Sequence, residues 1–346
     1  MTVHQLLKEI RQQPRAIIDT VVQEDEEVDR VSKFVTGSTR FLGMGSSYFA
    51  SHYAKYILQE IAHIDVEVGL ASEFLHYPTR VRNGQVFFLV SQSGESVETV
   101  KVVNFLKHQH AKIIAVTNDR ESSLARASDM TLLMHAGEER ASATKTFTST
   151  LAIFHRLAFF TATRKSLISP TLLGKSNTQL ISCANSMEEE MPHLEATIRK
   201  EVHQTKSYRS IAVLARGFNL ASALQSALLF KEVAKVPAEG MTAGEFMHGP
   251  IEMASAELLA IVLTGGRTSS LMDKLVGRLK KVNAETLTIG PQAKRMTRSV
   301  LLKQKDETLL PFPSIVSLNL IVYFTALRLR LNPDRFDHMS KVTLVE

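Results

Sequence analysis

The sequence predicts an α/β protein with two doubly wound parallel-sheet domains, the second a copy of the first. Three observations support this fold class. The chain repeats itself at a fixed spacing, and its short apolar runs alternate with segments of helical period. Its 346 residues also exceed what a single core normally fills.

The internal repeat is read directly from the sequence. Residues 41–76 align without a gap on residues 213–248, so that residue 41 lies over residue 213 at an offset of 172. A match of this length indicates two domains of one fold. The pairs of identical residues are Leu42 with Leu214, Gly45 with Gly217, Glu60 with Glu232, Ala62 with Ala234, Glu67 with Glu239, Ala71 with Ala243, Glu73 with Glu245, Phe74 with Phe246 and His76 with His248.

Each copy alternates apolar runs with amphipathic segments. Strands that are apolar throughout and alternate with helices predict a parallel sheet covered on both faces, which binds ligands at the carboxyl ends of its strands. The same offset places VFFLVSQSG, from Val86, over LLAIVLTGG, from Leu258. The first copy is expected to contain strands at 39–44, 65–69, 85–90, 112–117 and 129–134, and helices at 47–62, 96–107 and 145–162.

The boundaries follow from the repeat and from the composition between the copies. Pro170 and Pro192 are expected to interrupt the helical connection, and the apolar stretch from Ile315 to Leu327 to form a buried helix. The expected segments are an N-terminal helical segment at 1–34, a first domain at 35–166, a helical linker at 167–206, a second domain at 207–330 and a C-terminal tail at 331–346.

Composition argues against several classes of protein. The net charge of +6 is spread along the chain without a basic block, so nucleic acid is not an expected partner. Cys183 is the only cysteine, the N-terminus lacks a signal-peptide pattern, and the most apolar run is too short to span a membrane. We therefore expect a cytoplasmic protein without membrane contact. No HExxH, Cys/His cluster or GxGxxG motif is present, so no metal or organic cofactor is expected.

Two loops rich in hydroxyl groups lie between a strand and a helix in the first copy. They are SQSGES, from Ser91 to Ser96, and GMGSS, from Gly43 to Ser47. Hydroxyls and free backbone N–H groups at a helix N-terminus suit a phosphate, which we favour because two such loops occur together. The alternative is that Ser96 or Ser47 merely caps its helix.

The second copy keeps a glycine but lacks the first two serines of SQSGES and the serine pair of GMGSS. It has LTGGRTS where the first has VSQSGES, and its first loop is ARGFN. The copies have therefore diverged unequally, and only the first is expected to bind an anion.

Candidate acid–base residues lie in the second copy. Glu232 ends a long apolar helix, where a carboxylate can act as a base, and His248 in the HGP turn can carry a proton. The first copy has Glu60 and His76 in register, which leaves open that both positions serve the fold alone.

Four motifs together resemble the SIS (sugar isomerase) family over residues 35–346. They are SQSGES, ATKTFTSTL from Ala143, FKEVAKVPAEGMTAGEFMHGP from Phe230 and the terminal DRFDHMSKVTLVE. The resemblance implies two tandem SIS-type, flavodoxin-like domains. It is strongest to the isomerase half of glucosamine-6-phosphate synthases and to the SIS-type glucosamine-6-phosphate deaminases.

The resemblance also implies roles for individual residues. Glu232 would move a proton between carbons 1 and 2, His248 would open the sugar ring from the partner subunit of a homodimer with shared active sites, and Lys341 would form or assist an imine. The tail at 331–346 would then be part of the active site. The phosphate would be bound by Ser47, Ser91, Gln92, Ser93 and Ser96, with Ser46, Ala141 and Ala143 as candidate sugar-binding residues.

The sequence departs from the family pattern at two positions. Leu229 stands where relatives often carry a lysine, and Ala143 stands where they often carry a serine. Because the chain begins Met1–Thr2 rather than with a cysteine nucleophile, amide transfer from glutamine is not expected.

The expected function is deamination and isomerisation of an amino-sugar phosphate, with glucosamine 6-phosphate giving fructose 6-phosphate and ammonia. In this scheme the N-terminal half holds the phosphate while acid–base groups of the C-terminal half act on the carbonyl end. The enzymatic alternatives are a fructosamine-6-phosphate deglycase and another phosphosugar aldose–ketose isomerase. A non-catalytic sugar-phosphate sensor is the alternative from another class.

Overall fold

The computed structural model describes residues 3–205, 208–293 and 298–338. The chain divides into two compact units, each containing one sheet. Among the described residues, the first-sheet unit comprises Gln12–Glu139, Lys145–Ala184 and His338, and the second-sheet unit comprises those within Val3–Arg11, Arg140–Thr144 and Asn185–Asp337.

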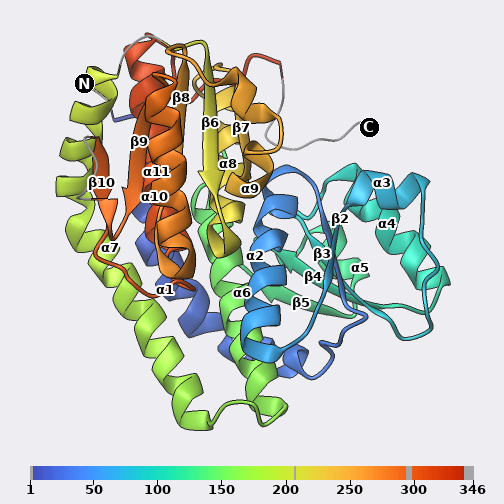
Figure 1. Cartoon of the computed structure of the whole chain (residues 1–346). Helices are drawn as coiled ribbons and strands as arrows, with labels where there is room; N and C mark the ends of the chain where they lie inside the picture. The colour runs from blue at the N-terminus through green and yellow to red at the C-terminus, as the bar shows by residue number, and fades with distance from the viewer. Residues whose placement is uncertain (1–2, 206–207, 294–297, 339–346) are drawn as a thin grey trace. The chain divides into compact units, whose positions relative to one another are not determined.

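The first sheet is parallel and five-stranded, with the order β2-β1-β3-β4-β5 (Figure 1). This is the order of a doubly wound flavodoxin-like sheet. Its strands are β1 (Arg40–Gly43), β2 (Glu67–Leu70), β3 (Val86–Val90), β4 (Lys112–Thr117) and β5 (Met130–Leu133). The helices that connect or follow them are α2 (Gly45–Ala62), α3 (Ala71–His76), α4 (Val97–His108), α5 (Ser123–Ala127) and α6 (Lys145–Arg164).

Buried apolar side chains join this sheet to its helices. Phe87 and Leu89 of β3 pack with Val102 and Leu106 of α4. A polar contact joins two other helices, since the hydroxyl of Tyr53 in α2 lies 2.9 Å from Nδ1 of His155 in α6. Burial, with a smaller contribution from Arg156, lowers the pKa of His155 to about 3, so its ring is neutral at physiological pH.

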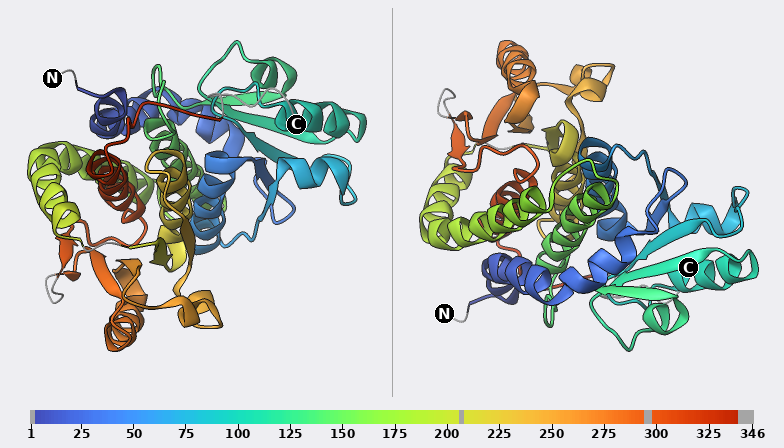
Figure 2. Two further views of the ribbon diagram at one scale, coloured as in Figure 1. Left: turned by 90° about the horizontal axis from the view of Figure 1, so that it is seen from above. Right: turned by 90° about the horizontal axis from the view of Figure 1, so that it is seen from below.

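The second sheet is also parallel, with the order β10-β9-β8-β6-β7 (Figure 1). Figure 2 shows α10 and α11 on opposite faces of this sheet. Its strands are β6 (Ser210–Ala215), β7 (Ala238–Thr242), β8 (Leu258–Leu263), β9 (Glu285–Gly290) and β10 (Ser299–Leu301). The helices of this part are η1 (Gly217–Asn219), α8 (Leu220–Glu232), α9 (Ala243–Phe246), η2 (Pro250–Met253), η3 (Gly266–Thr268), α10 (Ser269–Lys281) and α11 (Pro311–Arg328).

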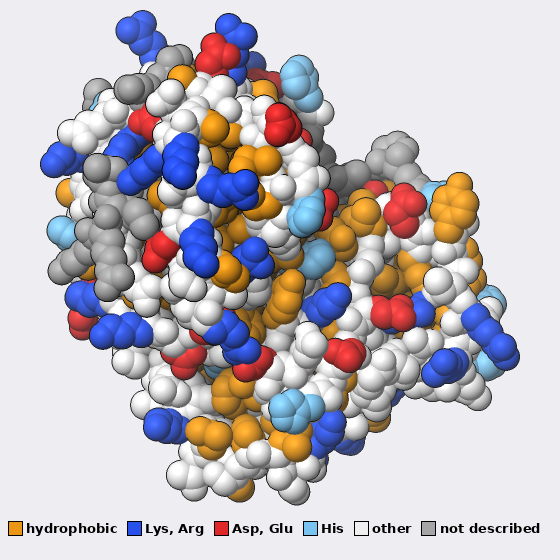
Figure 3. Space-filling view, viewed as in Figure 1, with side chains coloured by type: hydrophobic (Ala, Val, Ile, Leu, Met, Phe, Trp, Pro, Cys, Tyr) orange, Lys and Arg blue, Asp and Glu red, His pale blue; other side chains and the backbone are white. Residues whose placement is uncertain are grey.

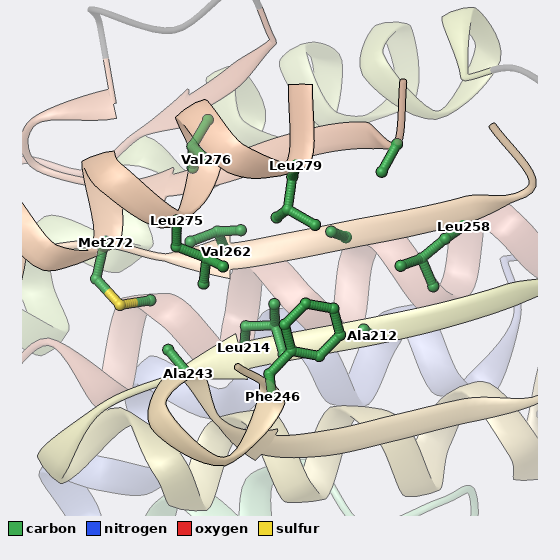
Figure 4. Packing of buried hydrophobic residues seen from close by; sticks show 12 residues of the cluster. Ala212, Leu214, Ala243, Phe246, Leu258, Val262, Met272, Leu275, Val276 and Leu279 are labelled. Carbon is green, nitrogen blue, oxygen red and sulfur yellow. The ribbon is translucent and has the colours of Figure 1, made fainter. Parts of the chain in front are cut away.

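Figure 4 shows the core between the second sheet and α10. Leu275 and Leu279 of α10 pack over Val262 of β8 and Leu214 of β6, beside Phe246 of α9. These apolar residues of α10 recur at helical spacing, which explains why the segment folds as an amphipathic helix.

The first turn of α1 (Gln5–Ser32) is capped by a residue from the other end of the described chain. Asp334 accepts the N–H groups of Gln5 and Leu6, one on each carboxylate oxygen, both at 2.8 Å. A carboxylate at a helix N-terminus satisfies free donors and opposes the positive end of the dipole. The C-terminal segment is therefore fixed to α1 within the second-sheet unit.

The predicted repeat is confirmed by the topology. Read from the other edge, the second sheet has the order β7-β6-β8-β9-β10, which matches β2-β1-β3-β4-β5. Local details repeat too, since Gly45 and Gly217 have φ values of 48° and 56°. The turns after α2 and α8 place His63 and Lys235 in the left-handed conformation. The next residue in each turn donates its backbone N–H to the carbonyl six residues earlier, as in a Schellman motif.

The expected offset of 172 is wrong beyond the HGP turn. Strand pairing aligns Leu42 with Leu89 in the first sheet and Leu214 with Val262 in the second, so Leu89 corresponds to Val262 at an offset of 173. The ends of α4 and α10 agree, since Ala111 and Ala284 each donate to a leucine, Leu106 and Leu279. One residue has been inserted between residues 248 and 259. The strand VFFLV therefore corresponds to residues 259–263, and LTGGRTS does correspond to VSQSGES.

The expected strands and helices of the first copy are present within two residues at each end. The expected interruption of the connecting helix is wrong, because α7 (Pro170–Gln204) continues through Pro192. Pro170 is its first residue, where a missing N–H is tolerated. Buried Met187, Met191 and Ile198 continue one apolar stripe past the proline, and burial of such a stripe outweighs the loss of one backbone bond.

Candidate functional site

The two hydroxyl-rich loops begin at neighbouring strand ends in the first-sheet unit. β1 ends at Gly43 and β3 at Val90, and these two residues are partners in the parallel pairing. The strand order reverses between β1 and β3, and such a position is the usual ligand site of a doubly wound sheet. A Cβ atom at Gly43 would lie only 3.0 Å from the Val90 oxygen and from Cβ of Ser47, so glycine permits this close approach.

The Ser91–Ser96 loop is organised by its own hydroxyl groups. The buried Ser91 accepts the N–H of Gly94 at 3.2 Å, and its Oγ lies 3.2 Å from Oγ of Ser96. Ser93 accepts the N–H of Glu95 at 3.2 Å. Gly94 has a φ of 64°, and a Cβ there would clash with Ser122 at 2.1 Å from its Oγ.

Neither Ser47 nor Ser96 makes a capping hydrogen bond. Ser47 lies inside α2, whose N-cap residue is Met44, and Ser96 occupies the N-cap position of α4 without a side-chain cap. Ser122, in contrast, accepts the N–H of Ala125 and caps α5. The capping alternative is therefore not what the structure shows, and the first N–H groups of α2 and α4 are not satisfied by a side-chain cap.

Polar side chains around these helix N-termini have capacity for a ligand. In the described part of the chain, the hydroxyls of Ser46 and Ser47 and the amide of Gln92 form no hydrogen bond, and all three side chains are partly exposed. The carboxylate of Glu95 accepts the N–H of Ser123 at 2.7 Å. Because the Ser123 N–H already binds the negative charge of Glu95, that charge opposes a second anion in the loop less strongly.

The candidate base Glu232 shares one stripe of α8 with two buried residues of the second-sheet unit. Gln225, Leu229 and Glu232 fall within an arc of about 60° for a helix of ~3.6 residues per turn. Gln225 and Leu229 are fully buried and Glu232 is partly buried, whereas Lys231 is exposed. Leu229, at the position where a lysine is expected in relatives, therefore places an apolar side chain beside the candidate base Glu232.

The loop at 140–144 carries the candidate sugar-binding residues and belongs to the same unit as α8. The carboxylate of Glu9, fully buried in α1, accepts the N–H of Arg140 at 2.7 Å and that of Ala141 at 3.1 Å. Nε2 of Gln225 donates to the carbonyl oxygen of Ala143 at 3.0 Å. A buried carboxylate and a buried amide therefore fix this loop at both ends.

His248 is exposed in the turn after α9, where its N–H donates to the carbonyl of Glu245 at 2.9 Å. Gly249 follows with a φ of 135°, a conformation that favours glycine. Within the described ranges the imidazole of His248 makes no hydrogen bond. The ring is therefore accessible to solvent or to a second molecule.

Lys341 lies outside the described residues. The last described segment before it is fixed near the end of α8, because Asp337 lies 3.4 Å from Nζ of Lys235 and 2.9 Å from Nε of Arg335. Lys235 is three residues after Glu232.

Glu9 and Gln225 were not expected from the sequence as functional residues. A signal was present, because helical spacing places Glu9, Gln13 and Glu24 on the same stripe of α1 as Leu6 and Ile17, and all are buried. A charged residue on an apolar stripe is rarely buried without partners. The pattern thus indicates a carboxylate with a specific task.

A hollow of about 210 Å³ lies beside β2 and α3 and contains none of the predicted site residues. The positive charge that lines this hollow belongs to Arg40, and it is neutralised by an ion pair because Nε of Arg40 lies 2.6 Å from the carboxylate of Glu67. The residues the structure describes contain no cluster of three or more His, Cys, Asp or Glu side chains suited to a metal. They also contain no helix long and apolar enough to cross a membrane.

The model of the SIS domain family matches residues 37–160 and 206–322, one match for each sheet. The chain belongs to the SIS domain family. Over 99% of its length this SIS chain is 29% identical to the isomerizing glutamine–fructose-6-phosphate aminotransferase of Clostridium acetobutylicum and 31% identical to that of Thermococcus kodakarensis. It spans only 59% and 58% of those relatives' lengths.

Solved structures share the SIS fold at lower identity. The C-terminal domain of glucosamine-fructose-6-phosphate aminotransferase from Francisella tularensis has a TM-score of 0.88 at 22% identity, and the match covers 94% of this chain and 96% of that one. Glucosamine-6-phosphate deaminase from Thermotoga maritima has a TM-score of 0.78 at 21% identity over 99% and 100%. Tagatose-6-phosphate ketose/aldose isomerase from Escherichia coli has a TM-score of 0.79 at 18% over 95% and 94%.

Proposed function

We propose that this SIS chain is an enzyme that deaminates and isomerises an amino-sugar phosphate, converting glucosamine 6-phosphate to fructose 6-phosphate and ammonia. The observation that carries the proposal is the pair of helix N-termini after β1 and β3. Both lack side-chain caps, and free hydroxyl and amide groups surround them. This is the chemistry that a dianionic phosphate requires.

The phosphate would be bound by the first turns of α2 and α4 together with Ser47, Gln92 and Ser93. Ser91 and Ser96, whose hydroxyls contact each other at 3.2 Å, would hold the loop in shape and donate to the same anion. Ser46 is a further donor beside the phosphate. A rigid, prearranged set of donors binds an anion without the entropic loss of ordering the loop.

The proposed reaction begins with ring opening by His248, which would act as a proton carrier from the partner subunit of a homodimer. Glu232 would then remove the proton from carbon 2 of the open-chain aldehyde and return it to carbon 1. This transfer converts the carbon 2 amine into an imine, and water hydrolyses the imine to a ketone and ammonia. Ala141 and Ala143 would contribute backbone groups to the sugar, since their loop is fixed by Glu9 and Gln225.

Lys341 is proposed to assist at the imine. The contact between Asp337 and Lys235 supports this role, because it fixes the start of the tail near Glu232. Lys341 follows Asp337 by four residues, and a chain of that length reaches at most ~14 Å. A primary amine within this reach can stabilise or exchange with the imine.

Leu229 favours one alternative, a deglycase that releases an amino acid from a fructosamine 6-phosphate. It is fully buried on the α8 stripe that carries Glu232. An apolar side chain there suits a carbon-bearing leaving group better than it suits ammonia. The acid–base residues and the phosphate loops would be the same in both reactions.

Ammonia release by the purified protein tests the proposal. Glucosamine 6-phosphate, its galacto and manno epimers, and fructosamine 6-phosphates would each be supplied, with product analysis of sugar and amine. Release of ammonia and fructose 6-phosphate from glucosamine 6-phosphate is the expected result. Amino-acid release from a fructosamine 6-phosphate alone would favour the deglycase, and turnover of neither class would refute both.

A further inference from the structure

The second sheet has its own counterpart of the Ser91–Ser96 loop. Ser91 donates its N–H to the carbonyl of Val116, and Thr264 donates in the same way to Ile289 at the offset of 173. The core of the following helix keeps this offset, so the loop is equally long in both copies. Residues 264–269 therefore correspond one by one to residues 91–96.

A carboxylate of the chain itself lies in this second loop. Oε2 of Glu307 accepts the backbone N–H of Arg267 at 3.3 Å and its Nε at 3.1 Å. Arg267 corresponds to Gly94, whose N–H is instead taken up inside the first loop by Ser91. The hydroxyl of Thr264 donates to the Ile289 carbonyl instead of contacting the Arg267 N–H, and the Arg267 N–H is bound by Glu307.

The two glycines of the second loop make room for this carboxylate. A Cβ at Gly266, the counterpart of Ser93, would lie 2.3 Å from Cδ of Glu307. A Cβ at Gly265 would lie 2.5 Å from Cδ1 of Leu310 in the same segment. Glu307 thus takes the space of a side chain at the position that supplies a hydroxyl in the first copy.

The electrostatic surroundings of this loop suit an anion, whether it is the Glu307 carboxylate or a bound ligand. The loop leads into the N-terminus of α10, which has no side-chain cap on Thr268 and carries the positive end of the helix dipole. Figure 3 shows Lys and Arg side chains over this part of the chain, and Arg278, Lys280 and Lys281 lie in the last turn of α10, at the other end of the helix from the loop. The Glu307 side chain is only 24% exposed, whereas the Arg267 side chain is 60% exposed.

We propose that the loop at 264–269 is a second anion site, which the chain closes with its own Glu307. The ligand class it would accept is a small phosphate, either inorganic or a monoester, bound by the Arg267 N–H, its guanidinium and the first turn of α10. The intact protein would then present one phosphate loop per chain, although it contains two copies of the fold. Removal of the Glu307 side chain would open the second phosphate loop, at 264–269.

Titration calorimetry with inorganic phosphate tests this on the full chain. Glu307→Ala is expected to bind one phosphate more per chain than the parent, and Arg267→Ala in that background is expected to lose the additional site. Glu307→Ser, which leaves a hydroxyl where Ser93 provides one, serves the same test where the alanine variant does not fold. Because the gain is counted against the parent, it does not depend on phosphate binding by the first loop.

Glu257→Ala is the matched control. It also removes a surface carboxylate that pairs with an arginine, Arg209, in the same unit, but it lies away from the loop. The control is expected to bind as many phosphates as the parent. Equal stoichiometry for the parent and a folded Glu307 variant would overturn the proposal, as would an equal gain in Glu257→Ala.

Discussion

The side-chain amide of Gln225 donates a hydrogen bond to the carbonyl oxygen of Ala143 at 3.0 Å. Gln225 is fully buried in α8, and the Ala143 carbonyl that it contacts is partly buried. This hydrogen bond joins the helix that ends in Glu232 to the loop that carries the candidate sugar-binding residues. The candidate base and this loop are therefore parts of one rigid structure within the second-sheet unit.

Gln225→Leu should lower the free energy of unfolding by about 0.5–1.5 kcal/mol, because it removes the hydrogen bond to the partly buried carbonyl of Ala143. If the loop positions the sugar, KM for the phosphosugar should also rise by about tenfold while kcat changes less. Urea denaturation and steady-state kinetics measure the two effects.

Ser226→Ala provides the control for Gln225→Leu. The neighbouring Ser226 hydroxyl is buried and has no hydrogen-bond partner in the described part of the chain, so its removal should leave stability unchanged or raise it. A rise in KM for both variants would contradict a specific role of the Gln225 bond.

Glu232→Gln should reduce kcat by about 10²–10⁴-fold, the usual contribution of a positioned general base, with little change in substrate affinity. Glu60→Gln changes the corresponding residue of the first copy and should retain activity. Turnover and calorimetric binding of substrate separate the two effects. Retained biological activity in Glu232→Gln would instead favour a sugar-phosphate sensor.

Ser96→Ala should raise KM about tenfold, because it removes a hydroxyl from the proposed phosphate site and from its contact with Ser91. Ser269→Ala is the matched substitution in the second copy and should leave KM unchanged, since Glu307 already occupies that loop. An equal effect of the two substitutions on KM would speak against a single phosphate site per chain.

Mixing two inactive variants tests the proposed sharing of active sites between subunits. If His248 acts in the partner's site, a heterodimer of Glu232→Gln and His248→Asn contains one intact site. An equal mixture should recover about a quarter of wild-type activity, because half the dimers are mixed and each has one working site. No recovery after verified subunit exchange, or full activity of a protein that light scattering shows to be monomeric, would contradict sharing.

Acid should destabilise the protein through His155. Its pKa is about 3 in the folded chain and near 6.5 in an unfolded one, so the unfolded state binds more protons between these values. The free energy of unfolding therefore falls as the pH drops from about 6.5 toward 3, by at most ~1.4 kcal/mol per pH unit from this residue.

His155→Gln should remove that part of the pH dependence while retaining an acceptor for Tyr53. Urea denaturation at pH 7, 6 and 5 gives the slope, and His108→Gln, at an exposed histidine, should keep the wild-type slope. The same slope in wild type and His155→Gln would exclude this explanation.

Most of the fold could be predicted because the relevant signals are local or repeated. Apolar runs marked the strands, and pairs such as Leu42 with Leu214 revealed the repeat. The one-residue insertion after His248 could not be located, because an apolar strand matches itself almost equally well at either register. Pro192 was misjudged since the sequence shows the lost N–H but not the packing that compensates for it.

The candidate site was only partly accessible from the sequence. The serine loops follow strand ends, so their placement could be expected. Whether Ser96 caps its helix depends on side-chain geometry, which residue order does not determine. The tasks of Glu9 and Glu307 depend on contacts with residues 131 and 40 positions away, and pattern alone does not identify such partners.

The cap that Asp334 places on α1 has a mechanical consequence. One turn beyond the capped N–H groups of Gln5 and Leu6 comes Glu9, which the Gln5 side chain also contacts at 2.8 Å and which secures residues 140 and 141. Loss of the Asp334 contacts would fray the start of α1. The hydrogen bonds between Glu9 and the loop at 140–144 would then weaken as well. The segment that holds Asp334 and the loop at 140–144 are therefore expected to loosen together.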